Sequence, residues 1–106
     1  MIFLVFCQDA PGGTERRAAL GKAHMAHIRA TRPHYLAAGP CPADTARPEQ
    51  ASLLLIEAAD EAAARALIES DPFFTGGVWK DMVIRPFRPV VGTWLPAGME
   101  VDLERY

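Results

Sequence analysis

Apolar residues in this chain form short runs that are separated by polar or proline- and glycine-rich stretches. Residues 2–7 and 52–57 are almost continuously apolar, which is typical of strands buried on both faces of a sheet. Residues 35–38 form a shorter apolar run, and residues 78–87 alternate imperfectly between apolar and polar side chains. The pattern therefore predicts four strands.

Two segments between these strands have the spacing of amphipathic helices. Thr14 can cap the first, which we expect to end near Thr31 because Pro33 disfavours helical geometry at the preceding residue. Asp60 can cap the second, at residues 61–69. The inner face of the first helix is predicted to carry Leu20, either Ala23 or His24, His27 and Ile28. The packing stripe of the second is predicted to carry Ala62, Ala63, Ala66, Leu67 and either Ala64 or Ile68.

Proline and glycine mark the expected ends and loops. Gly39-Pro40 is predicted to close the second strand, and residues 41–50 to form a surface loop. Residues 1–89 then form one domain, and residues 90–106 form a tail broken by proline and glycine. Because this tail contains Trp94-Leu95, it could lie at an oligomer interface.

The predicted order of elements is β-α-β-β-α-β, the order of a ferredoxin-like α+β fold. Its four strands would form an antiparallel sheet with both helices on one face. The other face would still carry large apolar side chains, because residues 2–7 and 52–57 lack polar alternation. Exposed apolar surfaces of that size usually mark interfaces. We therefore predict a homodimer with its sheet faces packed together, able to assemble into larger oligomers.

Charge and composition narrow the classes of partner. The 106-residue chain has a formal net charge of −2 and no basic run longer than Arg16-Arg17. This argues against nucleic acid and anionic membrane as main partners. The apolar run at residues 2–7 follows no basic segment and is too short to span a bilayer. We therefore expect a cytoplasmic protein.

The chain contains two cysteines, Cys7 and Cys41, on strands that the predicted fold separates by a third. Strand spacing would place them about 9–10 Å apart. A disulfide requires Cα atoms closer than about 7 Å. We expect both thiols to be reduced and mostly buried.

Candidate chemistry centres on one helix face and one helix end. His24 lies on the inner face of the first helix, and Arg17 lies seven residues earlier on the same side. Asp71 follows the second helix, where the fold could bring it beside His24. An imidazole, a carboxylate that orients it and a cation around one cleft could support proton transfer on a small anionic substrate.

Each of these residues also has a purely structural interpretation. His24 could be a core histidine bonded to a backbone carbonyl, and Asp71 a turn residue before proline. Arg17 could pair with Glu15 or another surface acid instead of a substrate anion. His27, one helical turn after His24, would allow shared metal ligation with help from His34, Asp71 or Cys41, but no zinc motif is present and we expect no metal. Aromatic residues could line a substrate pocket or simply pack in the core: Phe73, Phe74 and Trp79.

Several segments, in their order and approximate spacing, resemble the YciI-like family of small dimeric α+β proteins. They are Arg17 with Ala23-His24-Met25, Ala38-Gly39-Pro40, Ser70-Asp71-Pro72-Phe73, Gly77 and Ile84-Arg85-Pro86-Phe87. The resemblance implies a ferredoxin-like fold dimerised into an α/β barrel, similar to muconolactone isomerase, with an active site built on His24 and Asp71. One branch resembles dehydrochlorinases of chlorinated hydroxyquinols. This chain departs from the common pattern in having His27 and a longer tail.

Together, the residues and the resemblance predict a small enzyme, a lyase or isomerase, that transfers protons on a small oxygenated acid such as an aromatic one. His24 and Asp71 are the predicted catalytic residues, and Arg17, Gly39, Pro72 and Phe73 the predicted substrate-binding residues. We expect no cofactor. The alternatives are a non-catalytic ligand-binding or accessory module and a haem-binding dimeric barrel.

Overall fold

The structure is a computed structural model that describes residues 1–94. Its strands are β1 (Ile2–Asp9), β2 (Tyr35–Cys41), β3 (Ala51–Glu57) and β4 (Trp79–Phe87). Its helices are α1 (Gly13–Ala30), α2 (Glu61–Glu69) and α3 (Pro72–Thr75), with a 3-10 turn at Arg32–His34. Leu95 of the predicted tail lies outside the described residues, so the role of the tail at an interface stays a prediction.

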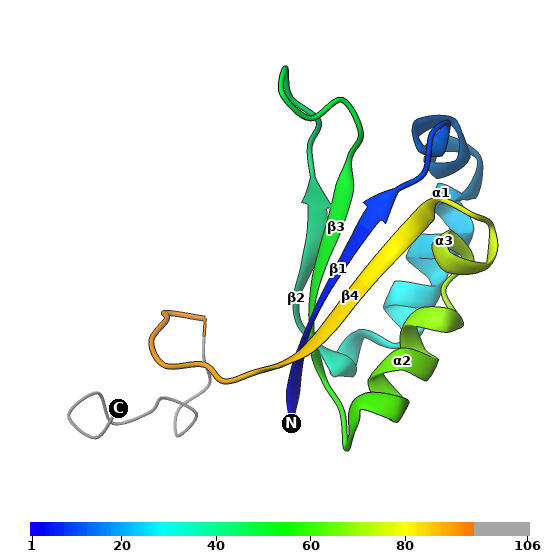
Figure 1. Ribbon diagram of the computed structural model, residues 1–106. Coiled ribbons are helices and arrows are strands. Elements are labelled where there is room, and N and C mark those ends of the chain that lie inside the picture. Colours follow the sequence, from blue (N-terminus) through cyan, green and yellow to red (C-terminus); the bar gives the residue numbers. More distant parts are fainter. Residues whose placement is uncertain (95–106) are drawn as a thin grey trace.

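The strands form a single antiparallel sheet in the order β2-β3-β1-β4. All three helices lie on one side of this sheet, and the other side carries none (Figure 1). This arrangement confirms the predicted ferredoxin-like α+β fold, with the short α3 as an addition. Within the described residues, no helix combines the length and the apolar character needed to cross a bilayer.

The core lies between the sheet and the helices. Alternate residues of β1 point toward the helices, and Phe3, Val5 and Cys7 are almost completely buried there. They belong to one apolar cluster with Ile68 of α2 and Phe73 of α3. Burial of this cluster fixes the helices against the sheet and so sets the position of every side chain on their inner faces.

The opposite sheet face remains apolar, as the lack of polar alternation predicted. Phe6 of β1 lies directly across from Leu53 of β3 and Val83 of β4. These three side chains are between 36% and 50% exposed. Phe87 of β4, which lies four residues after Val83 and therefore on the same face, is also exposed. A single chain therefore leaves a row of large apolar side chains in contact with solvent.

The start of α1 differs from the prediction, because Gly12 and not Thr14 precedes the helix. Gly12 has a positive φ of 78°, which glycine adopts without strain. A Cβ at Gly13 would meet Asp9 Cβ at 3.0 Å, so the chain turns into α1 directly against the end of β1. The helix therefore begins here because Gly12 and Gly13 have no side chains, and not because a side chain caps it. The predicted cap at Asp60 is confirmed, since its side chain accepts from Ala63 N at 2.8 Å.

Two further element predictions were wrong in detail. β2 continues through Gly39-Pro40 to Cys41, because an edge strand pairs on one side only and tolerates a residue without an N–H.

In α2, the two residues that were predicted as alternatives, Ala64 and Ile68, are both completely buried. The other predicted stripe members except Leu67 are exposed: Ala62, Ala63 and Ala66. This short helix therefore touches the core along one narrow row.

Candidate active site

Asp71 is held in place by the short helix that follows it. It is the N-cap of α3, and its Oδ1 accepts a hydrogen bond from Phe73 N at 2.8 Å. Pro72 occupies the first turn, where a missing N–H costs nothing. Asp71 and Pro72 follow the end of α2, as predicted, and the same two residues also begin α3. This capping fixes a completely buried carboxylate.

His24 projects from α1 to meet that carboxylate. Its Nδ1 lies 2.8 Å from Asp71 Oδ1, and its side chain is 18% exposed. Ala23, the alternative inward residue, is exposed. With Asp71 ionised, Nδ1 carries the proton and Nε2 is left as the basic nitrogen. The second oxygen, Asp71 Oδ2, is buried and has no hydrogen-bond partner among the described residues. The carboxylate charge is therefore available to stabilise an imidazolium at His24.

Aromatic rings fix the plane of the imidazole. The Phe73 ring stacks on His24 with a centroid separation of 3.7 Å and an interplanar angle of 3°. The Trp79 ring lies perpendicular to both rings, with centroid separations of 6.4 Å from His24 and 5.8 Å from Phe73. Phe73 is thus buried support for the imidazole and not an open pocket wall, and Phe74 packs against the core. The rings favour one orientation of His24.

Arg17 has a partner that the sequence analysis did not identify. Its Nε and Nη2 donate to the two oxygens of Asp9, at 2.6 and 2.8 Å, and Nη2 also donates to Ser52 Oγ at 2.8 Å. Among residues 1–94, neither Glu15 nor another surface acid pairs with Arg17. Asp9 is 1% exposed and ends β1. The charge of Arg17 is therefore already balanced inside the protein.

A signal for Asp9 was present in the sequence. Phe3, Val5 and Cys7 are the inward positions of β1, and the same alternation places Asp9 on the helix-facing side. Ser52 carries no comparable signal, because a serine in an apolar strand has no charge that demands a partner.

Arg17 and His24 both line a cavity of about 300 Å³ between α1 and the sheet. Gly39 of β2, a predicted substrate-binding residue, lines it, and so do Ser52 and Trp79. Pro72, which was predicted to bind substrate, is not among the lining residues. The remaining wall is apolar or small and consists of Met25, Ile28, Ala38, Pro40 and Leu54. The cavity therefore combines a mostly apolar wall with two cationic or basic side chains.

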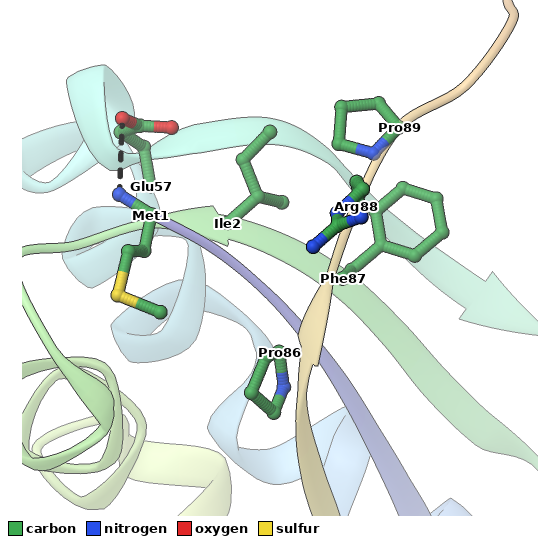
Figure 2. A pocket seen from close by; sticks show the side chains of 7 residues that line it. All are labelled: Met1, Ile2, Glu57, Pro86, Phe87, Arg88 and Pro89. Atoms are coloured by element: carbon green, nitrogen blue, oxygen red, sulfur yellow. Dashed lines mark ion pairs between the residues drawn. The ribbon is translucent and has the colours of Figure 1, made fainter. Parts of the chain in front are cut away.

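A second cavity, of about 540 Å³, lies at the other end of the sheet, where β1 begins and β4 ends. Figure 2 shows the Met1 amine paired with Glu57 at one side and Phe87, Arg88 and Pro89 at the other. The amine lies 3.6 Å from Glu57, and both groups are more than half exposed. This cavity is larger, but no histidine lines it, and its one carboxylate, Glu57, is an exposed side chain paired with the amino terminus.

The environment of the Cys7 thiol makes it unreactive. Burial raises the pKa of the Cys7 thiol to about 12, and the negative charge of Asp71 adds to the increase. Cys7 and Cys41 are free and lie on β1 and β2, with β3 between them, as predicted. Within residues 1–94, no group of three or more histidine, cysteine or acidic side chains is arranged to hold a metal ion.

Sequence comparisons place this chain in a known family. Residues 1–88 match the YCII-related domain. An uncharacterised protein of Haemophilus influenzae is 31% identical over 97 residues, covering 85% of this chain and 99% of that protein. Protein YciI of Escherichia coli is 30% identical over the same shares of both chains.

Solved structures share the fold at lower identity. 5-Chloro-2-hydroxyhydroquinone dehydrochlorinase (TftG) of Burkholderia phenoliruptrix, in complex with 2,5-dihydroxybenzoquinone, has a TM-score of 0.72 and 23% identity, over 84% of this chain and 95% of that one. A candidate antibiotic biosynthesis monooxygenase of Bacteroides thetaiotaomicron has a TM-score of 0.52 and 21% identity, over 88% and 91% of the two chains. The family match and the curated relatives together show that this chain belongs to the YCII-related domain family.

Proposed function

We propose that this protein is a small enzyme of lyase or isomerase type, in which His24 transfers a proton on a small, cyclic, oxygenated molecule. The observation that carries the proposal is the 2.8 Å contact between His24 Nδ1 and Asp71 Oδ1 at the wall of a cavity. A positioned histidine with an orienting carboxylate is the usual arrangement for general acid–base work.

In this proposal His24 is the base and Asp71 its orienting partner. Nδ1 is turned to Asp71, so Nε2 is the nitrogen that takes a proton from the substrate. Asp71 stabilises the imidazolium that forms, and Phe73 holds the ring in plane. In a lyase, the electron pair that remains when His24 removes the proton forms a double bond, and a leaving group departs from the adjacent atom. In an isomerase, His24 returns the proton to another atom of the same substrate.

The size and lining of the cavity support a single-ring substrate. Ligand sites usually enclose about 300–1,000 Å³, and this cavity lies at the small end of that range. TftG, whose structure holds 2,5-dihydroxybenzoquinone, shares the fold and suggests hydroxylated rings as the first compounds to test. The apolar wall would hold the ring, and Arg17 and His24 would contact its oxygens.

We also propose that a second copy of the chain covers the apolar sheet face. The row formed by Phe6, Leu53 and Val83 supports this proposal, because a second copy of the same apolar row, related by a two-fold axis, would cover it in an isologous interface. Packing of two such sheets would produce the dimeric α/β barrel that the family resemblance implies.

A turnover screen tests the enzymatic proposal. Hydroquinones, chlorinated hydroxyquinols and small unsaturated lactones are incubated with the protein in D₂O, and products are followed by mass spectrometry for chloride loss, isomerisation or deuterium uptake. The proposal expects at least one compound to react faster than in buffer. Compounds that bind without any reaction would favour a binding module instead. A haem titration with a Soret shift would support the haem-binding alternative.

A further inference from the structure

A second pair of charged side chains, Arg17 and Asp9, adjoins the cavity. Arg17 lies two helical turns before His24 on α1. Arg17 uses Nε and Nη2 for Asp9 and Ser52, which is a side-on, two-point attachment to the carboxylate. Nη1 takes part in no hydrogen bond among the described residues. The guanidinium is therefore fixed along one edge and keeps its other edge for a ligand.

The fold is built to bring this pair together. Asp9 ends β1 at a register shift and donates its backbone N–H to Gln50 O at 3.0 Å. Gly13 has no side chain, and a Cβ there would lie 3.1 Å from Asp9 Oδ2. This close approach sets the first turn of α1 against the carboxylate. Asp9 is thus as firmly placed as Asp71, and it holds Arg17 in the way that Asp71 holds His24.

The two pairs are also coupled through one aromatic ring. Arg17 Cζ lies 5.2 Å from the centroid of the Phe73 ring, which stacks on His24. The distance between the free guanidinium edge and the imidazole is therefore determined by Phe73 and by the α1 backbone. A ligand oxygen on Arg17 would place the rest of a small ring within reach of His24.

The charge balance around the cavity determines which ligands can bind there. Arg17 and His24 are the only ionisable side chains among the described residues that line it, and each has a buried carboxylate behind it. With His24 neutral, Asp9, Arg17 and Asp71 together sum to −1. With His24 protonated, the sum is zero. An anionic ligand would lose its hydration without meeting a net positive charge.

We propose that Asp9 is a positioning residue that neutralises Arg17, so that the cavity selects uncharged oxygenated rings over carboxylates. This inference rests on the proposed function only in taking the cavity as the substrate site. It differs from the small anionic substrate that was predicted from an imidazole, its carboxylate and a cation around one cleft. Arg17 serves as a fixed hydrogen-bond donor to a hydroxyl or carbonyl oxygen, not as a charge for a carboxylate.

Calorimetric titration of the full chain with hydroquinone and benzoate tests this inference, because the two rings have similar size and differ in charge. We expect the parent protein to bind hydroquinone at least about tenfold more tightly than benzoate. Asp9→Asn should lower that ratio by about tenfold or more, through tighter benzoate binding to an unbalanced Arg17. Asp44→Asn is the matched control, since Asp44 pairs with Arg47 on an exposed loop, and it should leave the ratio unchanged.

A second variant covers the case in which Asp9→Asn does not fold. Ser52→Ala removes one bond to Arg17 and no charge, so it should weaken hydroquinone binding while benzoate remains the weaker ligand. Parent protein that binds benzoate as tightly as hydroquinone would overturn the inference and leave the proposed function standing. An unchanged ratio in a folded Asp9→Asn protein would do the same. Parent protein that binds neither ring would overturn the proposed function and this inference together.

Discussion

His24 Nδ1 lies 2.8 Å from Asp71 Oδ1, although the two residues are 47 positions apart in the chain. The contact depends on two local features. The α1 helix turns His24 inward, and the N-cap of α3 fixes Asp71 through the hydrogen bond from Phe73 N. Asp71 Oδ1 thus receives two hydrogen bonds, one structural and one from the imidazole. Stability and chemistry are therefore linked at this position.

Asp71→Ala should destabilise the protein more than loss of a cap alone. The substitution removes the cap of α3 and leaves the His24 Nδ1 proton without its acceptor, for a combined cost of about 2–4 kcal/mol. Asp60→Ala is the matched control, because Asp60 caps α2 and has no hydrogen bond with a histidine within residues 1–94, and it should cost about 1 kcal/mol. Urea denaturation measures both. Equal losses of the free energy of unfolding would show that the imidazole contact adds no stability.

The tautomer of His24 should be fixed by Asp71. In ¹⁵N NMR spectra of the free protein, we expect a protonated Nδ1 and an unprotonated Nε2 above the pH at which the ring is charged. Asp71→Asn should keep this tautomer, because the amide oxygen can still accept from both Phe73 N and Nδ1, while its negative charge is lost. A mixture of tautomers in the parent protein would argue against a fixed orientation.

Much of the fold could be predicted because its signals are periodic. Continuous apolar runs identified β1 and β3, and the helical spacing around His24 indicated the inner face of α1. The features that were missed depend on contacts between distant segments. Asp9 was missed because its partner, Arg17, is recognisable only once β1 and α1 are packed together. The narrow contact row of α2 likewise depends on how little of that helix meets the core.

Thiol labelling should distinguish the two cysteines. Because burial raises the pKa of Cys7 to about 12, its thiol stays protonated and unreactive at pH 8, whereas Cys41 is partly exposed. One thiol should therefore react in the native protein and two in denaturant. Cys41→Ser should abolish native labelling, and rapid native labelling of that variant would contradict the burial of Cys7.

The same shift gives the sign of a pH effect on stability. The pKa of Cys7 is raised from 9.0 to about 12, so the folded state favours the neutral thiol. The stabilisation of the folded state that comes from the neutral Cys7 thiol is complete below about pH 9 and is lost as the pH rises toward 12. Thermal unfolding between pH 9 and 11 should therefore show a steeper loss of stability in the parent than in Cys7→Ala. Parallel pH profiles for the two proteins would refute this.

The apolar sheet face should determine oligomeric state. Phe6→Glu places a charge between Leu53 and Val83 at the centre of the proposed interface, and we expect it to give a folded monomer. Ala62→Glu, at an exposed position of α2, should leave the dimer intact. Light scattering at micromolar concentration measures both variants. A parent protein that is a stable monomer at that concentration would exclude the dimer.

The central claim is that His24 carries out proton transfer, and the most direct measurement is the rate of reaction on a compound identified by the turnover screen. His24→Gln should lower turnover by roughly 10²–10⁴-fold, the usual loss when a general base is removed. His27→Gln, one helical turn along α1 and not among the cavity-lining residues, serves as the control and should retain the parent rate. A folded His24→Gln protein that turns over substrate at the parent rate would contradict the account and leave His24 as a packing residue beside Asp71.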